Sequence, residues 1–489
     1  MFVPAKLKPV HFAVRPAVIA KHLGQVLTVI ALLSLVPLLV SLFHGRYDTV
    51  LRYGIVIAGL LAVSVPCSRL SVGRHLQRNE ALAISGLVFV LPPFALAIPL
   101  MSYGLSYGDA IFEVISGITT TGLSVLGSVE QLPFPFHFAR AWLQWIGGLG
   151  VIVLSVAFLL QPGTATRHLG FDRAEVDDVV GGMRAHAQRV LIVYALVTLL
   201  GILALMLTGL TIGDSVLHTF AAISTGGFSN YDTSLAALPN SASRITVIVI
   251  CLLGAIPFFL FYAVLMRRFG SVFGNPQLQG LFVMVVLTTA AIYLFQWRGD
   301  PGDPLAKLEI AALTAISAQS TAGFSVIPYD QLQTATVGML IAAMLIGGGL
   351  GSTAGGIKIL RLMIVVKFMH LLVLRCSVPE SAHVSTTLGG RRLEGGEIES
   401  AAAIVLGYFT IAFISVIVFL AYGYEPLDSI FDVASAVGTA GLSSGLSGPE
   451  LPGVLKAVLC VDMLMGRVET VALIVLLFPG TWIGKRYKQ

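Results

Sequence analysis

The sequence predicts an all-α polytopic membrane protein with ten transmembrane helices and four re-entrant segments, arranged as four repeats with fourfold pseudo-symmetry. Three observations lead to this prediction. Of the 489 residues, 56% are hydrophobic and 11% are charged, whereas soluble domains carry about 25% charged residues. Apolar stretches long enough to span a bilayer recur along the whole chain. A short hydroxyl-rich pattern also recurs four times, which indicates an internal repeat.

The composition also narrows the class of protein. The net charge is +5 and the pI is near 9.0, but a basic excess in a membrane protein usually lies in its cytoplasmic loops, so nucleic acid is not indicated as a partner. Apolar character builds up only after Lys21 with no small-x-small cleavage site following, so the first apolar segment is expected to remain as a helix. The cysteines show neither CxxC nor metal-ligand spacing; they are Cys67, Cys251, Cys376 and Cys460.

The expected spanning segments each contain an apolar run that approaches or exceeds the length needed to cross a bilayer. They are 23–43, 50–66, 80–102, 139–161, 186–210, 243–266, 278–297, 335–375, 399–422 and 453–478. The pair Pro92-Pro93 should kink the third of them. Four other apolar pieces are too short to span, namely 107–118, 213–223, 307–319 and 427–437.

Each short piece leads directly into the repeated pattern, which reads small-Thr-small-Gly-(Leu/Phe)-Ser. Its copies are 119–124, 224–229, 320–325 and 438–443. An aspartate stands ten residues before three of the copies, as Asp109, Asp214 and Asp428, while the third copy has Ile310 there with Glu309 beside it. An acid followed by apolar residues is typical of a helix whose N-terminal dipole is compensated. Each repeat is therefore predicted to contain a helix, a short helix, a tight turn and a second helix.

The predicted division of the chain follows from these repeats. It comprises a cytoplasmic N-terminal segment 1–22, an extra helix pair 23–79, and four repeats at 80–163, 164–272, 273–392 and 393–489. With the N-terminus inside and every short piece re-entering from outside, Lys and Arg concentrate in the inner segments, as the positive-inside rule requires. Both termini are then expected to be cytoplasmic.

The repeated turn has a chemical interpretation. Irregular backbone at membrane depth is tolerated only where it lines a cavity or is buried in protein, and a ring of carbonyls can replace the water shell of a cation. Glycine at the fourth position permits the backbone angles that aim carbonyls inward. A single copy would be better explained as a helix-capping turn, but repetition in phase with matching preceding helices favours the ring. The candidate cation-binding residues are Thr120, Thr121, Gly122, Thr225, Gly226, Gly227, Thr321, Ala322, Gly323, Thr439, Ala440 and Gly441.

These turns and their preceding helices resemble the Trk/Ktr/HKT superfamily of potassium transporters, and most closely its TrkH/TrkG branch, over the whole chain. The resemblance implies four helix–pore-loop–helix repeats around one pore, with Gly122, Gly227, Gly323 and Gly441 as the key filter glycines. In HKT relatives a serine at the first position goes with sodium preference, so four glycines imply K⁺ as the transported ion. The extra pair 23–66 fits the TrkH branch and not KtrB.

The resemblance also implies surroundings and partners. It implies a homodimer in a bacterial inner membrane, with one pore per subunit, that binds a cytosolic nucleotide-binding ring of the TrkA type. No organic cofactor is implied. Nothing in the sequence itself indicates nucleotide binding, so nucleotide control would belong to the partner.

A glycine-rich stretch should break the span 335–375. Its glycines are Gly347, Gly348, Gly349, Gly351, Gly355 and Gly356, and each costs a helix roughly 1 kcal/mol relative to alanine. Close helix packing explains spaced glycines but not three in a row, and the spacing differs from that of a phosphate-binding P-loop. The resemblance implies an intramembrane gate at 347–356, and Lys358 is a candidate anchor for its cytoplasmic end.

Arg467 lies within the last predicted span, where a charge is costly and should face the protein interior or a water-filled cavity. Glu469 is two residues away, on a different helix face, and Asp462 is only roughly aligned. The resemblance implies that Arg467 projects into the pore beside the gate loop and raises a barrier to cations, while structural pairing remains the alternative. Glu113 and Asp432, in the first and fourth short helices, fit pore-mouth acids or capping groups equally well.

The expected function is potassium uptake. A sodium- or proton-coupled symporter of the same fold is the first alternative, because the pattern does not separate a channel from a symporter. An inverted-repeat transporter with broken helices is disfavoured, since it requires halves of opposite topology and all four repeats run the same way. An enzyme is weaker still, because the sequence shows no acid–base or metal cluster.

Overall fold

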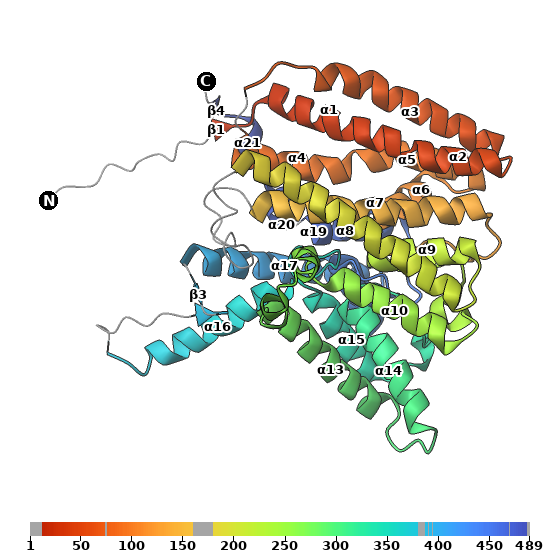
Figure 1. The fold of residues 1–489 in the computed structure, drawn as a ribbon, viewed down its shortest axis with the longest axis vertical. Helices are drawn as coiled ribbons and strands as arrows, with labels where there is room; N and C mark the ends of the chain where they lie inside the picture. The colour runs from red at the N-terminus through yellow and green to blue at the C-terminus, as the bar shows by residue number, and fades with distance from the viewer. Residues whose placement is uncertain are drawn as a thin grey trace. The chain divides into compact units, whose positions relative to one another are not determined.

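The computed structural model describes residues 12–73, 76–159, 179–379, 387–389, 391–393, 395–468 and 470–486, and within these ranges it is mainly helical (Figure 1). The chain forms two compact units. One takes the described residues up to Gly104 together with those from Val468 onward, and the other is Leu105–Arg467. The repeated turns, the glycine-rich stretch and Arg467 all belong to the second unit.

The first unit consists of helices and one short pair of strands. The helices are α1 (Pro16–Leu33), α2 (Leu35–Phe43), α3 (Tyr47–Ser68), α4 (Arg78–Val90), α5 (Pro92–Leu100), the 3₁₀ turn η1 (Met101–Tyr103), α20 (Thr470–Leu477) and α21 (Pro479–Trp482). Strand β1 (Phe12–Ala13) pairs in parallel with β4 (Lys485–Arg486). In Figure 1, α1 and α3 run side by side. Their close approach depends on Gly24, where a methyl group would lie 2.8 Å from the carbonyl oxygen of Ser64.

Two features of this unit follow from proline chemistry. The helix is interrupted just before Pro92-Pro93, where the sequence predicts a kink, since α4 ends at Val90 and α5 begins at Pro92; proline has no N–H to continue the preceding helix. The first helix begins at Pro16, seven residues before the predicted start at 23, because proline is well suited to the first position of a helix. The expected N-terminal segment 1–22 therefore includes the first turns of α1.

The second unit contains the repeats. Its helices are α6 (Tyr107–Ile118), α7 (Phe134–Leu159), α8 (Val179–Leu207), α9 (Ile212–Ile223), α10 (Ser241–Ala255), α11 (Phe258–Leu265), α12 (Phe269–Phe273), α13 (Pro276–Gln296), α14 (Pro304–Gln319), α15 (Thr334–Ile346), α16 (Ile359–Arg375), α17 (Gly395–Ala421), α18 (Pro426–Gly438) and α19 (Gly453–Val468). Two 3₁₀ turns, η4 (Ser234–Ala237) and η5 (Tyr329–Gln331), and the antiparallel strands β2 (Thr387–Leu388) and β3 (Arg391–Arg392) complete it.

The four short helices α6, α9, α14 and α18 precede the four copies of the pattern, as predicted. The Ser106 hydroxyl accepts a hydrogen bond from the backbone N–H of Asp109 at 3.2 Å, and Thr211 does the same for Asp214 at 3.1 Å. These are N-caps, which satisfy donors that a helix start leaves unpaired. The aspartates ten residues before the pattern thus lie in the first turn of the helix, where its dipole favours an acid.

The described residues include six helices that are long and apolar enough to cross a membrane, and a bent pair that raises the number to seven. That pair falls within the predicted span 243–266 and shows that this segment is sharply bent. Helices α10 and α11 meet at 95° around Ile256-Pro257, since Pro257 cannot donate the helix hydrogen bond and disfavours helical angles in the residue before it. The predicted break in 335–375 is present: α15 ends at Ile346 and α16 begins at Ile359.

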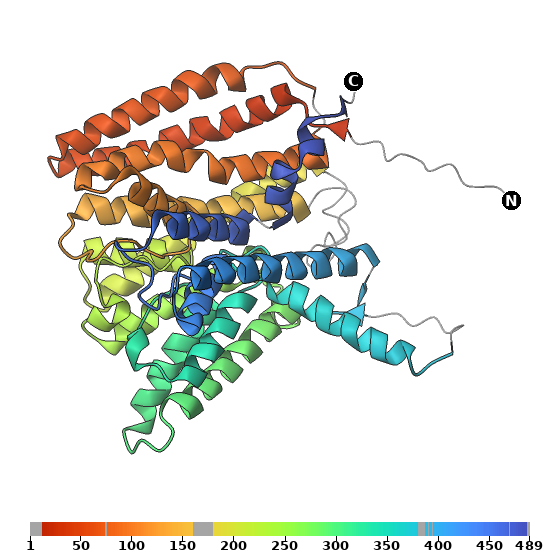
Figure 2. The same ribbon diagram turned by 180° about the vertical axis from the view of Figure 1, so that it is seen from behind.

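The core of the second unit lies between neighbouring repeats. One buried cluster joins α8, α9 and α10 to Leu313 and Phe324 of the third repeat. A second cluster joins α13, α14 and α15 to Phe431 and Ala440 of the fourth repeat. Figure 2 shows the molecule from behind, where α16 (cyan) and α17 (blue) lie side by side near the glycine-rich stretch.

Candidate functional site: four equivalent turns and a glycine-rich loop

All four turns have the same backbone conformation. Their second residue is a threonine in the left-handed region, with φ of 53° at Thr120, 52° at Thr225, 54° at Thr321 and 49° at Thr439. Their fourth residue is a glycine with positive φ, which is 95° at Gly122, 75° at Gly227, 74° at Gly323 and 84° at Gly441. Left-handed threonine costs roughly 1–2 kcal/mol. The same unfavourable conformation occurs at the equivalent threonine of all four turns, which indicates that the turns require it.

Each turn ends its short helix in a Schellman motif. In the first copy the N–H of Thr120 donates to the carbonyl of Gly117, and the N–H of Thr121 donates to that of Ser116, both at 2.9 Å. These 5→2 and 6→1 bonds define the motif, and its left-handed position is usually glycine. The corresponding 6→1 donors in the other copies are Gly226, Ala322 and Ala440, at 2.7, 2.9 and 2.8 Å.

The four turns close into a ring. The Cα of Gly122 faces the carbonyl oxygen of Gly226, the Cα of Gly227 faces that of Ala322, the Cα of Gly323 faces that of Ala440, and the Cα of Gly441 faces that of Thr121. A methyl group at any of these glycines would lie closer than 3.0 Å to the oxygen that it faces. At each of these glycines the turn therefore approaches the backbone of the next turn, in the cyclic order first, second, third, fourth, first.

This ring borders a cavity of about 340 Å³. The residues that line the cavity include Gly122, Gly227, Gly323 and Gly441. Four segments separated by long stretches of sequence thus meet at one cavity.

The side chains that flank the glycines are mostly buried. Those that follow the glycine are buried: Leu123, Phe228, Phe324 and Leu442. The Thr119 and Thr121 hydroxyls are 2.8 Å apart, and Thr321 accepts from the N–H of Gly355 at 2.7 Å. Among the described residues, the buried hydroxyls of Thr120 and Thr439 have no hydrogen-bond partner. Hydroxyl bonding therefore supports the turns through some of their hydroxyl groups and not through all of them.

Glu113 brings together the segment after the first turn and the second repeat, a role that the sequence left open. Its Oε1 accepts from Ser124 Oγ at 2.7 Å and from the N–H of Val125 at 2.9 Å. Its Oε2 lies 2.9 Å from Arg140 Nε, as an ion pair outside hydrogen-bond geometry. The Arg140 guanidinium also lies 3.7 Å from the ring centroid of Phe228. Because charge pairing and cation–π contact converge on one buried arginine, the first and second turns are mechanically linked.

Asp432 occupies the same place in the fourth repeat, nine residues before its glycine. Its carboxylate accepts from the N–H of Ser444 at 2.6 Å and from Ser447 Oγ at 2.8 Å. Hydroxyl and backbone groups thus satisfy the carboxylate of Asp432, whereas Arg140 and Ser124 satisfy that of Glu113. His218 fills the equivalent position in the second repeat and stacks on Phe324. In the sequence, these three residues share only their position nine residues before the glycine of the repeated turn. Their equivalence becomes clear when the four turns are compared in the structure.

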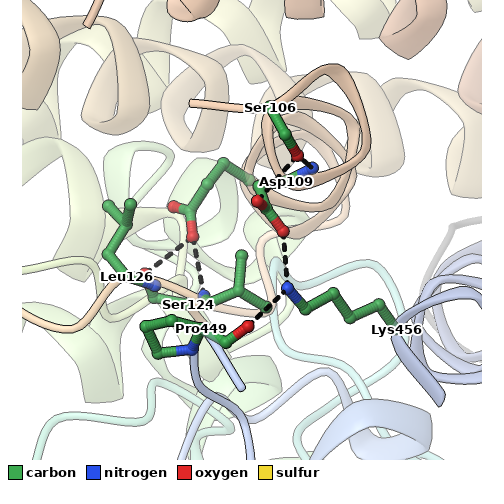
Figure 3. A network of polar contacts seen from close by, with 8 residues as sticks. Ser106, Asp109, Ser124, Leu126, Pro449 and Lys456 are labelled. Carbon is green, nitrogen blue, oxygen red and sulfur yellow. Dashed lines mark hydrogen bonds and ion pairs between the residues drawn. The ribbon is translucent and has the colours of Figure 1, made fainter. Parts of the chain in front are cut away.

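Polar contacts also join neighbouring repeats around the cavity. Between the first and second repeats, Asp232 accepts from Ser128 Oγ at 2.7 Å, and between the second and third, Ser234 Oγ accepts from the N–H of Ser325 at 3.2 Å. Between the third and fourth repeats, Tyr329 donates to Asp428 at 2.6 Å. Between the fourth and first, Lys456 donates to Asp109 at 2.6 Å. Together these contacts connect the repeats in the same cyclic order as the turns. Figure 3 shows the contact between the fourth and first repeats, in which Lys456 reaches both Asp109 and the Pro449 carbonyl.

The glycine-rich segment forms an irregular loop from 347 to 358. Its positive φ angles are 67° at Gly347, 81° at Gly351, 71° at Gly356 and 68° at Lys358. The loop is fixed by backbone contacts to the bend between α10 and α11, where Gly349 N–H donates to Ala255 and Phe258 N–H donates to Gly351, both at 3.0 Å. Lys358 is buried and its Nζ donates to the carbonyl of Ala354 within the loop.

The loop lies directly against the turns. The Thr353 hydroxyl donates toward the carbonyls of Ile223, at the end of α9, and Gly254, on α10, at 2.9 and 2.8 Å. A methyl group at Gly355 would lie closer than 3.0 Å to the Thr439 hydroxyl. A glycine at 355 is therefore needed for the loop to approach the fourth turn this closely. This requirement is separate from the tendency of glycine to break a helix.

Arg467 contacts the same loop. It lies near the end of α19 and is 5% exposed, and its Nη1 donates to the carbonyl of Thr353 at 2.5 Å. Its Nε and Nη2 have no hydrogen-bond partner among the described residues. Glu469, which is two positions from Arg467 in the sequence, lies outside the described residues. Asp462 instead accepts from Ser415 Oγ at 2.7 Å.

Apolar helices of spanning length, together with four equivalent turns that meet at one cavity, indicate a multi-pass membrane protein. Comparison with known proteins identifies the family. The family model for TrkH, described as a cation transport protein, matches residues 89–280 and 278–479. The chain belongs to this TrkH family, a family of cation transporters and not of enzymes.

Individual relatives match the chain over nearly its full length. A cation transporter of Methanocaldococcus jannaschii is 30% identical, with 93% of this chain and 94% of the relative covered. The Trk system potassium uptake protein TrkH of Halomonas elongata is 28% identical, with 95% and 98% covered. The crystal structure of the potassium transporter TrkH from Vibrio parahaemolyticus matches with a TM-score of 0.85 at 25% identity, covering 96% of this chain and 100% of that one.

Proposed function

We propose that this protein carries K⁺ into a bacterial cell across the inner membrane, through a selectivity filter built from the four turns and gated by the loop 347–356. One observation carries the proposal. Each filter glycine faces the carbonyl oxygen that precedes the glycine of the next repeat, and this relationship closes after four steps around the cavity. Carbonyl rings of this kind can replace the hydration shell of a cation. The relatives named as potassium uptake proteins support potassium as that cation.

The proposed architecture has ten transmembrane helices and four short helices that re-enter from outside. The repeats extend over 80–163, 164–272, 273–392 and 393–489, after the extra pair 23–79, with both termini cytoplasmic. The N-caps of α6 and α9 support the assignment, because they place the start of each short helix at polar side chains. Pairing into a homodimer and binding of a cytosolic TrkA-type ring follow from the family resemblance.

The proposed gate acts in series with the filter. The loop is held against the turns by Thr353 and Gly355 and is contacted by the buried Arg467. A positive charge at this place raises the energy of a dehydrated cation, because Coulomb repulsion is strong where water is excluded. Ions pass when the loop moves away and the Arg467–Thr353 bond breaks.

Replacement of Gly122 or Gly441 with serine tests the filter. Both glycines have positive φ, and a Cβ would collide with the facing carbonyl oxygen. We expect each serine variant to erode discrimination between K⁺ and Na⁺, measured as radioactive rubidium uptake into proteoliposomes with K⁺ and Na⁺ as competitors. An unchanged selectivity ratio in folded protein would refute the four-glycine filter.

A second candidate, a proton-coupled symporter of the same fold, is favoured by one observation. Asp462 on α19 is 1% exposed, and its Oδ2 has no hydrogen-bond partner in the part of the chain that the structure describes. A buried carboxyl group within a membrane helix is a candidate proton carrier. Uptake driven by an imposed pH gradient at zero K⁺ gradient distinguishes the two: coupling predicts accumulation that Asp462→Asn abolishes, whereas a channel predicts none.

A further inference from the structure

Gln144 on α7 brackets the filter glycine of the second repeat. Its Nε2 donates to the carbonyl oxygen of Gly226 at 2.6 Å, and its Oε1 accepts from the N–H of Phe228 at 3.2 Å. One carboxamide thus binds the backbone on both sides of Gly227. The Gly226 carbonyl is also the oxygen that Gly122 faces in the ring. The side chain is fully buried.

The same structural position is apolar in the other repeats. Gly147, Gly254 and Gly466 are equivalent, because each packs against the carbonyl at the end of its own repeat's short helix, that of Ile118, Ile223 or Val437. Three residues earlier stand Gln144, Cys251 and Met463. In the third repeat, Met344 shares a buried cluster with Ala440 of the next turn, just as Cys251 shares one with Ala322.

The residue that precedes the filter glycine varies together with this position. Ala322 belongs to the same buried cluster as Cys251 and Ala440 to the same cluster as Met344, whereas the Gly226 carbonyl accepts a hydrogen bond from Gln144. A methyl group at Gly226 would lie only 2.4 to 2.7 Å from the carboxamide atoms of Gln144, which is closer than real contacts allow. Gln144 therefore occupies the space that a side chain at position 226 would need.

We propose that Gln144 is a positioning residue that fixes the Gly226 carbonyl in the filter, and that Gln144 and Gly226 form a matched pair that makes the second turn chemically different from the other three. The inference rests on the proposed filter. Donation from Nε2 fixes the direction of the carbonyl and withdraws part of its negative charge, while acceptance from Phe228 prevents the following peptide from rotating. The pair thereby sets both the geometry and the field strength of one of the four oxygens, which are the two properties that determine discrimination among cations.

The test combines Gln144→Met, Gly226→Ala and the double variant, which recreates the Met344–Ala440 pairing. Gln144→Met should lower the K⁺ over Na⁺ preference about three- to tenfold, the equivalent of one net hydrogen bond. Gly226→Ala should lower uptake, since the methyl group would displace the Gln144 carboxamide from its two hydrogen bonds. The double variant should regain uptake to the level of Gln144→Met, without regaining its lost selectivity.

Gln296→Met is the matched control. Gln296 makes the same two-atom bridge away from the filter, donating to the Gln331 carbonyl at 2.8 Å and accepting from the N–H of Gln333 at 3.0 Å. Its loss should leave the selectivity ratio unchanged. If Gln144→Met does not fold, Gln144→Glu keeps the shape and the acceptor for Phe228 but removes the donor, and it should lower selectivity on its own.

Two results would overturn the inference. One is wild-type selectivity in folded Gln144→Met or Gln144→Glu, and the other is a double variant that transports no better than Gly226→Ala. Parallel measurement of Gly122→Ser separates this inference from the proposed function. If Gly122→Ser changes selectivity and the Gln144 variants do not, only the role of Gln144 fails, whereas if neither changes it, the filter itself fails.

Discussion

Arg467 donates a hydrogen bond from Nη1 to the carbonyl oxygen of Thr353 at 2.5 Å, which joins the end of α19 to the middle of the glycine-rich loop. The two residues are separated by more than a hundred positions in the chain, and both are buried. A charged donor strengthens such a bond relative to a neutral one. This contact therefore holds the loop in the position where it lies against the turns.

Replacement of Arg467 with glutamine should raise ion flux in the absence of the cytosolic partner. The variant removes both the charge and the charge-assisted bond, which is worth about 1.5–3 kcal/mol, so we expect a roughly tenfold or greater increase. Flux of radioactive rubidium into proteoliposomes measures it. Arg52→Gln is the control, since Arg52 forms only an exposed pair with Asp48. Equal flux in wild type and Arg467→Gln would contradict a barrier role.

Deletion of 347–356 should raise ion leak without the partner, because the loop is the proposed obstruction. A milder change is Thr353→Val, which keeps the shape of the side chain and removes its hydroxyl contacts to Ile223 and Gly254. The loss of such a bond costs about 1 kcal/mol, so leak should rise several-fold. Leak at the wild-type level in the folded deletion variant would show that the loop is not the gate.

Glu113→Gln should destabilise the protein more than Asp432→Asn, although the two acids hold equivalent positions. The first change leaves the guanidinium of Arg140, which is 2% exposed, without its carboxylate, and breaking a buried pair costs about 3–5 kcal/mol. The second removes a carboxylate whose described donors are hydroxyl and backbone groups. Thermal unfolding in detergent compares them. A larger loss of Tm in Asp432→Asn would show that the ion pair is not the dominant support.

The contact between the first and second repeats at Asp232 should depend on pH. Partial burial tends to raise the pKa of Asp232, but hydrogen bonds from Ser128 Oγ and the N–H of Val129 outweigh it, so the pKa is lowered overall. A lowered pKa in the folded protein gives stability that is present above the usual value of about 3.9 and is lost as the pH falls through the folded value.

Asp232→Asn should therefore lower Tm at neutral pH, and its difference from wild type should shrink once the pH falls below about 3.9. Tm measured across that range tests the expectation. Asp48→Asn serves as the control, because its exposed pair with Arg52 contributes little at any pH. A constant difference between wild type and Asp232→Asn at all pH values would contradict the proposed charge dependence.

The repeated turns could be found from sequence because they depend on local chemistry. Glycine is needed where φ is positive, and threonine, serine and small residues surround it in all four copies. The break at 347–358 was equally visible, because consecutive glycines are incompatible with a helix. The bend at Ile256-Pro257 was missed, although Pro257 was present in the sequence, because the apolar composition continues across it.

The way in which these parts meet depends on the packing of the folded chain. The sequence alone predicts four copies of one helix–turn unit, a glycine-rich break and one arginine within an apolar span. It does not show which turn lies next to which, because contacts such as that of Gly122 with the carbonyl oxygen of Gly226 join residues from different repeats. The roles of Glu113, Asp432 and Gln144 were likewise hidden. A buried polar side chain is defined by its partners, and those partners are brought together by packing and not by proximity along the chain.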